Sequence, residues 1–167
     1  LAFKRLNVGE LDCMGIDTWG VDYGLLDKNG HLLGNPRSYR MAVDADMERA
    51  WETVTYETLF ERTGIATMNF NTVYQLYRRK SEDDVALENA KTMLFMPDLL
   101  AYCLTGKKGV EYTMASTSQL LDPQKRDWSV EVFERLGLPK KLMAPIERPG
   151  ALRGTLLPEI ARECGVE

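Results

Sequence analysis

A hairpin signal near the amino terminus constrains the fold of this chain more than any other feature. The run VDYGLLD at 21–27 is apolar enough for a strand, and the DKNG that overlaps its end is a strong turn signal. The segment HLLGNPRSY at 31–39 is predicted to return as a further strand, and Pro36 favours a sheet edge or a strand end. Upstream, the short apolar run LDCMGID at 11–17 is consistent with a buried strand. This part of the chain is therefore expected to contain at least one antiparallel hairpin.

Helices are predicted for most of the remaining chain. Thr55 is a candidate N-cap for one of them, and Gly64 is a candidate C-terminal stop for the same helix. Ser81 is expected to cap another helix, with Asp84 near enough to complete a capping box. A strand-like TMLFM at 92–96 interrupts the series. The predicted helices span 44–54, 55–64, 71–80, 81–91, 97–104 and 128–137.

The composition is that of a globular domain. Hydrophobic residues make up 44% and charged residues 28% of the 167 residues, and a chain of this length can bury a sizeable core. The net charge of −4 argues against a nucleic-acid-binding protein, which usually carries a basic stripe. The basic run Arg78 to Lys80 is followed at once by acidic residues at 82–84 and is interpreted as a solvated helix end. Strands mixed with helices predict an α/β fold with a mixed sheet.

Cysteine and histidine are too sparse for a zinc cluster. Three cysteines lie far apart, no CxxC pair occurs, and His31 is the single histidine. This pattern favours a reducing, cytoplasmic setting, and no apolar run approaches the roughly 18 residues of a membrane span. The chain begins with Leu1 in a helix-like segment at 1–6, passes a turn at 7–10, and stops in another helix-like segment. We therefore expect it to be part of a longer protein.

Polar residues, rather than a nucleophile or phosphate motif, carry the chemical signal. No Walker loop, GxGxxG, HExxH or GxSxG occurs. Sugar recognition uses planar hydrogen-bonding groups, close backbone approach at glycine and an aromatic face, which the Trp19-Gly20 pair and Asn-Phe-Asn at 69–71 provide. The residues alone leave a second interpretation open, in which Trp19 belongs to the core and Asp17 caps a bend. The candidates are Asp17, Thr18, Trp19, Gly20, Asp22, Arg40, Asn69, Asn71, Gln75 and Asp98.

Several segments in a fixed order resemble one enzyme family. They are GIDTWGVDYGLLDKNG at 15–30, SYR at 38–40, ERTGIATMNFNTVYQL at 61–76, MLFMPDLLAYCLTG at 93–106 and EYTMASTSQLLD at 111–122. Together they are similar to the FGGY family of carbohydrate kinases, and in particular to its L-rhamnulose kinases. DTWGVD combined with FNTVYQL is the specific part of this resemblance.

The resemblance implies a ribonuclease-H-like fold of the actin and hexokinase type. Members of the family have two such domains, with sugar and ATP in the cleft between them. Residues 1–167 would then be part of the amino-terminal, sugar-binding domain, and a second domain of the same parent chain would be its partner. The phosphate-contacting loop is expected upstream of this sequence.

The same resemblance assigns candidate substrate-binding residues. The backbone at Gly20 would contact the ketose, while Trp19 and Thr18 would shape the floor of the pocket. Phe70 falls where related kinases place an aromatic residue on the substrate, and Asn71 lies nearby. No catalytic residue is expected in this chain, because the HDT-like motif that carries the family's aspartate base does not occur.

The implied activity is ATP-dependent phosphorylation of L-rhamnulose, helped by Mg²⁺. ATP and Mg²⁺ are expected to be bound mainly by parts of the parent protein outside this sequence, so the isolated chain is expected to be inactive. L-Fuculose and L-xylulose are alternative substrates. A module that binds a sugar or a protein without transferring phosphate is an alternative of a different class. The role of Arg40 stays open, since no aspartate follows it as in the family.

Overall fold

The computed structural model describes residue 5 and residues 12–166. Apart from Arg5, the helix end predicted at 1–6 and the turn predicted at 7–10 lie outside the described residues. Among those residues, no helix is long and apolar enough to cross a membrane.

An antiparallel strand pair lies in the middle of the fold. β1 (Tyr23–Leu26) pairs with β2 (Thr92–Phe95), with Tyr23 opposite Phe95 and Leu26 opposite Thr92. Every residue of β1 is buried. Both strands were predicted from their apolar runs, and both predictions are confirmed.

The turn predicted at 27–30 is confirmed, and a backbone hydrogen bond of 3.1 Å closes it. The returning strand predicted at 31–39 is reduced to a single bridge between Leu32 and Leu26. The backbone leaves the extended conformation soon afterwards, since Gly34 has a φ of +82°. This left-handed conformation stops the strand before a ladder can form.

The strand predicted at 11–17 is wrong for the residues that the structure describes. Residues 12–17 form no strand, and Asp12, Cys13, Met14 and Gly15 are exposed. An apolar run becomes a buried strand only where a neighbour completes its backbone hydrogen bonds. No strand among the described residues pairs with this segment.

Helices surround the strand pair, and the positions predicted for the longer ones are confirmed to within a few residues. The remaining strands are short: β3 pairs in parallel with β6, and β4 pairs antiparallel with β5. The elements are η1 (Tyr39–Met41), α2 (Asp44–Trp51), α3 (Tyr56–Thr63), α4 (Thr72–Ser81), α5 (Val85–Asn89), α6 (Met96–Thr105), β3 (Val110–Glu111), α7 (Tyr112–Ser116), β4 (Leu121–Asp122), β5 (Asp127–Trp128), α8 (Val130–Leu136), η2 (Lys140–Leu142), β6 (Ile146–Glu147) and α9 (Pro158–Cys164).

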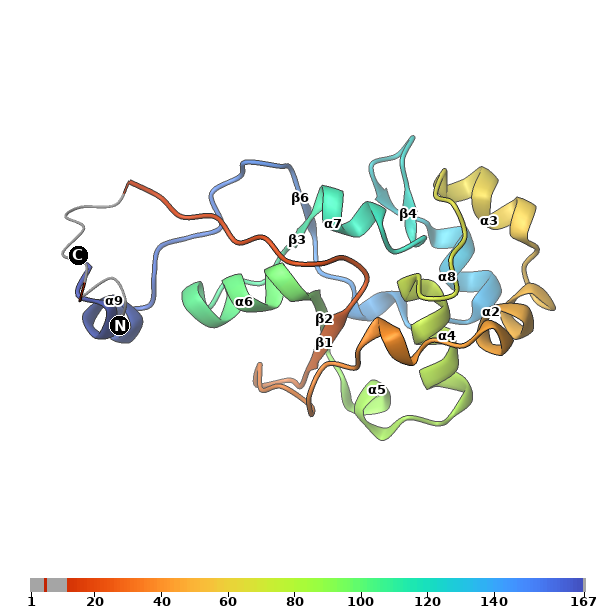
Figure 1. The fold of residues 1–167 in the computed structure, drawn as a ribbon, viewed down its shortest axis with the longest axis horizontal. Helices are drawn as coiled ribbons and strands as arrows, with labels where there is room; N and C mark the ends of the chain where they lie inside the picture. Colours follow the sequence, from red (N-terminus) through yellow and green to blue (C-terminus); the bar gives the residue numbers. More distant parts are fainter. Residues whose placement is uncertain (1–4, 6–11, 167) are drawn as a thin grey trace.

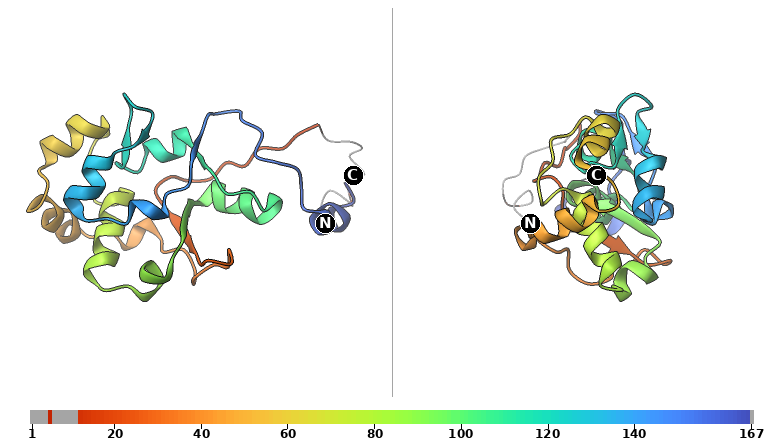
Figure 2. Two further views of the ribbon diagram at one scale, coloured as in Figure 1. Left: turned by 180° about the vertical axis from the view of Figure 1, so that it is seen from behind. Right: turned by 90° about the vertical axis from the view of Figure 1, so that its right-hand side faces the viewer.

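The molecule is elongated, as Figure 1 shows. α2 and α3 lie at one end, and α9 lies at the other (Figure 1). The segment before β1 runs toward the same end as α9, which the reverse view in Figure 2 also shows. α9 is tied back to α6 by a hydrogen bond of 2.8 Å from the Leu157 N–H to the Leu104 carbonyl.

Helix caps follow the sequence signals at α3 but not at α5. Thr55 Oγ1 accepts the Thr58 N–H at 3.3 Å, and Gly64 ends the helix with a φ of +68°. The capping box predicted from Ser81 and Asp84 is wrong, because α4 continues through Ser81. Asp84 itself caps α5, since its carboxylate accepts the Leu87 N–H at 2.9 Å.

The basic run at the end of α4 is not a wholly solvated helix end. Arg79 is only 7% exposed and forms two hydrogen bonds of 3.1 Å with the Asp84 carboxylate. Its guanidinium also lies 5.8 Å from the ring centroid of Tyr23. The interpretation of residues 78–80 as solvated is therefore wrong for Arg79, because the cap of the next helix provides it with a buried partner.

The core lies between the strand pair and the helices that pack on it. Phe95 of β2 stacks on Trp128 with ring centroids 6.5 Å apart, and Trp128 meets Phe133 of α8 edge-on at 6.3 Å. The Trp128 indole N–H donates to the Ala144 carbonyl at 2.9 Å, so this buried aromatic residue is fully paired. Tyr74 brings α4 into the same core.

An ion cluster ties the segment after β6 to α6. Arg153 donates to Asp98 Oδ1 at 2.9 Å, to Glu147 Oε2 at 2.5 Å and to the Gly109 carbonyl at 2.9 Å. Asp98 is 2% exposed and also accepts the Glu111 N–H at 3.1 Å. Glu111 and Glu147 are partners in the β3–β6 pair. Arg153 therefore supplies positive charge where three carboxylates converge.

Candidate functional site

The site begins at a tight backbone turn just before β1. The Asp22 N–H donates to the Gly20 carbonyl at 2.9 Å, and Val21 between them has a φ of +66°. This is a γ-turn of the rare positive-φ kind, which is strained for a β-branched residue. Strained backbone of this sort persists only where surrounding contacts hold it, and it clusters at functional sites.

The contacts that hold the turn come from α4 and α7, far along the chain. The Val21 carbonyl accepts from Thr72 Oγ1 at 2.8 Å and from Gln75 Nε2 at 3.2 Å. Gly20 faces Thr117, so a Cβ at position 20 would lie 3.2 Å from the threonine Oγ1. A larger residue at position 20 would push the Thr117 side chain aside by a few tenths of an ångström, so glycine suits this close approach.

Trp19 is exposed rather than part of the core. Its exposed fraction is 52%, yet its indole N–H donates to Asp22 Oδ2 at 2.7 Å. The interpretation of Trp19 as a core residue is therefore wrong. The indole presents an accessible aromatic surface whose polar edge is already bound to the protein.

Asp22 is the buried member of this pair. It is 3% exposed, and its Oδ1 has no hydrogen-bond partner among the described residues. Burial raises the pKa of the Asp22 carboxyl, while the Trp19 indole, the Tyr39 backbone N–H and the Gln75 amide oppose the rise. Within the described part of the chain, no basic side chain forms an ion pair with it.

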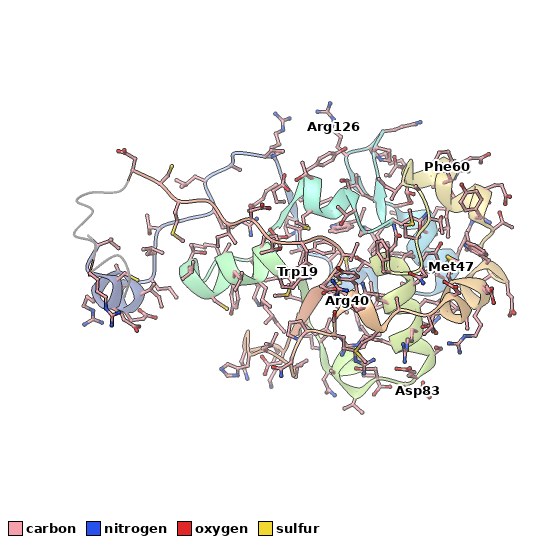
Figure 3. All side chains as sticks on the ribbon, in the orientation of Figure 1. Trp19, Arg40, Met47, Phe60, Asp83 and Arg126 are labelled. Carbon is pink, nitrogen blue, oxygen red and sulfur yellow. The ribbon has the colours of Figure 1, made fainter. Side chains whose placement is uncertain are left out.

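A second aromatic surface comes from Phe70 and η1. Phe70 is partly exposed and meets the Tyr39 ring edge-on, with centroids 5.6 Å apart. The exposed Arg40 guanidinium lies 5.5 Å from the Tyr39 ring centroid. Gln75 joins the two surfaces, because its amide donates to the Phe70 carbonyl at 2.8 Å as well as to the turn. Trp19 and Arg40 are labelled in Figure 3.

The other predicted residues have different surroundings. Asn71 is 3% exposed and holds backbone on both sides, since its Oδ1 accepts the Met68 N–H at 2.8 Å and its Nδ2 donates to the Thr117 carbonyl at 3.4 Å. The Thr18 hydroxyl donates to the Trp19 carbonyl at 2.9 Å. The structure thus brings Trp19, Gly20 and Phe70 to one region, whereas Asn71 is buried and supports that region through its hydrogen bonds to the backbone.

A small cavity lies beside this region. Its volume is about 30 Å³, which is far below the roughly 300 Å³ of a typical ligand pocket. Trp19, Gly20 and Phe70 do not line it. Of the residues predicted from the sequence, Asn69 and Gln75 line the cavity instead. The cavity is lined by Tyr23, Arg37, Ser38, Met41, Ala42, Asp46, Asn69, Tyr74, Gln75, Arg78 and Arg79.

Clustered metal ligands are absent from the described part of the chain. No group of three or more histidine, cysteine, aspartate or glutamate side chains there is arranged to hold a metal ion.

The sequence matches one family model almost from end to end. Residues 4–167 match the amino-terminal domain of the FGGY family of carbohydrate kinases. The chain belongs to this family. Curated relatives include rhamnulokinases of Oceanobacillus iheyensis, 39% identical over 155 residues, and of Bacteroides thetaiotaomicron, 40% identical over 154 residues. Each match covers 92% of this chain, but the chain spans only about a third of the length of these FGGY relatives.

Solved structures confirm the predicted ribonuclease-H-like fold of the FGGY chain. A ligand-bound xylulose kinase from Lactobacillus acidophilus matches 99% of this chain and 34% of its own, with a TM-score of 0.89 at 17% identity. A glycerol kinase from Plasmodium falciparum with ADP matches 92% of this chain and 32% of its own, with a TM-score of 0.78 at 15% identity. These two similarities establish the fold.

Three residues of the site were not among the candidates chosen from the sequence. Val21, Thr72 and Thr117 belong to it because the turn needs support from two other elements. The only local signal is the Trp-Gly pair itself, which marks the place but not its supports.

Proposed function

We propose that the full-length protein carrying this chain phosphorylates L-rhamnulose at its terminal hydroxyl, with ATP as the phosphoryl donor. This chain would supply part of the sugar-binding lobe. The observation that carries the proposal is an exposed Trp19 next to a tightly held Gly20, in a chain about 40% identical to two proteins named rhamnulokinase. A flat aromatic face beside accessible backbone suits the C–H and hydroxyl surfaces of a ketose.

The described residues have distinct roles in this proposal. Trp19 and Phe70 offer aromatic surfaces to the sugar carbons, and Gly20 lets the ketose approach the backbone. Thr18 shapes the floor beside Trp19. Asn71 is buried, so we assign it the role of fixing the loop that carries Phe70 rather than of touching the sugar.

The chemistry of the transfer depends on positioning. When ATP is bound, it supplies the phosphoryl group, and the sugar-binding lobe contributes by holding one hydroxyl in line for transfer. We assign the binding of ATP and Mg²⁺ mainly to parts of the protein outside this chain, as the family resemblance implies. We assign no general base to Asp17 or Asp22, in accord with the family pattern.

The test is ATP consumption by the full-length protein with L-rhamnulose, L-fuculose, L-xylulose or glycerol. We expect a preference for L-rhamnulose in kcat/KM of at least about tenfold, which corresponds to about 1.4 kcal/mol. A preference for another ketose would support a sugar kinase activity but contradict the choice of L-rhamnulose as its substrate. Turnover of none of the four would leave a binding module without phosphoryl transfer. The isolated 167-residue chain is expected to show no turnover, and product formation by it would contradict this division of roles.

A further inference from the structure

The bond between Trp19 and Asp22 is more than a cap on an exposed indole. An indole N–H that is half exposed can donate to water at no cost to the protein. Here it is bound at 2.7 Å to a carboxylate that is 3% exposed. The Tyr39 N–H and the Gln75 amide lie near this carboxylate without completing a hydrogen bond to Oδ1, and among the described residues it has no ion-pair partner. Burying such a carboxylate is an expensive way to satisfy an exposed indole. Such a group calls for a functional explanation.

The surroundings of Asp22 fix where the indole can lie. Asp22 directly follows the strained Val21, whose carbonyl accepts hydrogen bonds from Thr72 and Gln75. The carboxylate is therefore anchored to α4 through a turn with little freedom. Because the Trp19 indole N–H is bonded to this carboxylate, the Trp19 ring is held both through its backbone and at its N–H edge.

A carboxylate also changes the electronic character of the ring. A charged acceptor strengthens and shortens a hydrogen bond, and it polarises the donor group. Electron density pushed toward the indole makes its face more negative, which favours the weakly positive C–H groups of a sugar. A neutral acceptor would give the same geometry with less polarisation.

We propose that Asp22 is a positioning residue for the sugar, acting through Trp19: its carboxylate fixes the plane of the exposed indole and enriches the face that the ketose meets. This inference rests on the proposed sugar-binding function. It assigns Asp22 no contact with the reacting atoms and no proton transfer.

The first test compares kinetics in the full-length protein. Asp22→Asn keeps the size of the side chain and an acceptor oxygen, and Asp22→Leu removes the acceptor. Asp12→Asn is the matched control, because Asp12 is an exposed carboxylate in the same segment. We expect Asp22→Asn to raise the KM for L-rhamnulose about 3- to 10-fold, the scale of one aromatic interaction, with the KM for ATP unchanged. Asp22→Leu should raise it further, and the control should not raise it.

The second test separates positioning from a structural role. In a Trp19→Phe background the indole donor is gone, so Asp22→Asn should produce no further rise in the sugar KM. A purely structural Asp22 would give the same rise in both backgrounds and would lower the melting temperature without the split between sugar and ATP. Either result would overturn the inference. Unchanged sugar KM in Asp22→Asn and Asp22→Leu would overturn it as well.

A spectroscopic measurement distinguishes failure of this inference from failure of the proposed function. The indole ¹H–¹⁵N resonance of Trp19, assigned by its loss in Trp19→Phe, should lie downfield and move upfield in Asp22→Asn. Adding L-rhamnulose should shift it in the wild type. Shifts produced both by Asp22→Asn and by the sugar, without turnover, would overturn phosphoryl transfer and retain the role of Asp22. Turnover with a resonance that neither Asp22→Asn nor the sugar moves would retain the kinase and overturn the role of Asp22. Absence of both turnover and any shift would overturn both.

Discussion

Replacing Arg153 by methionine should destabilise the chain strongly. The change keeps most of the apolar stem but removes the cation from Asp98 and Glu147, which lie 2.9 and 2.5 Å from its nitrogens. Removing one partner of a buried ion pair costs about 3–5 kcal/mol. Glu147 is 31% exposed on its side chain and Asp98 only 2%, so water relieves the first carboxylate but not the second. We therefore expect the free energy of unfolding to fall by an amount near the lower limit, about 3 kcal/mol.

The stability that Arg153→Met loses should depend on pH in a defined direction. Burial raises the pKa of Asp98, and Arg153 opposes that rise. Without Arg153 the folded-state pKa is raised further, so the native state binds a proton more tightly than the unfolded chain does. Stability of the variant should then increase as pH falls through the window between the folded-state pKa and the ordinary value. The difference from wild type should be smaller at pH 5 than at pH 7.5.

Urea unfolding at the two pH values, followed by circular dichroism, measures both effects. Arg148→Met is the control, because Arg148 is exposed in the same segment. The double variant Arg153→Met with Asp98→Asn should recover part of the loss, since it removes the uncompensated charge. If Arg153→Met and Arg148→Met unfold at the same urea concentration, the cluster does not depend on the Arg153 charge and the reasoning is refuted.

Three further perturbations follow from the fold. Asp84→Asn should cost about 3 kcal/mol at pH 7, because it leaves Arg79 buried without its counter-ion, whereas the exposed Asp83→Asn should be near neutral in urea unfolding. Burial alone would raise the pKa of Asp84, but hydrogen bonds from Arg79 and a backbone N–H hold it below its ordinary value. The stability that ionised Asp84 contributes is therefore present above the ordinary pKa and is lost as pH falls through the folded-state pKa. If the stability lost in Asp84→Asn did not shrink at acid pH, the assignment would be contradicted. Gly24→Ala should cost about 1–3 kcal/mol, because its Cβ would lie 2.7 and 2.9 Å from two leucine methyl carbons, and an unchanged melting temperature would show that those side chains move aside. Thr55→Ala should cost about 1 kcal/mol by loss of the α3 N-cap, and Thr55→Ser should restore it in the same urea assay.

Local signals in the sequence were sufficient where an element's ends are decided by its own residues. The cap at Thr55 and the stop at Gly64 depend on neighbours within a few positions, and the structure has them as predicted. α6 likewise has Pro97 in its first turn, although it begins one residue earlier than predicted, at Met96. The apolar run at 12–17 could not be judged in this way, because a strand needs a partner that the run itself does not specify. The burial of Arg79 also depends on a contact outside its helix.

The candidate site shows the same division. The Trp19-Gly20 pair is visible in the sequence as an aromatic residue beside a glycine. In the structure Trp19 is exposed, and Gly20 lies close to the Thr117 side chain. The hydrogen bond from Thr72 to Val21 joins residues 51 positions apart. The unpaired Asp22 oxygen is likewise the result of packing rather than of residue type. Supports of this kind cannot be inferred from local pattern.

The left-handed backbone of Val21 affects how this domain can evolve. Glycine at that position would relieve strain of order 1 kcal/mol, but it would also remove a side chain that is only 8% exposed, so the lost burial opposes the relieved strain. The same mutation would let the turn sample many more backbone conformations. Position 21 is therefore a place where relief of backbone strain is opposed both by burial of the valine side chain and by the fixed shape of the turn.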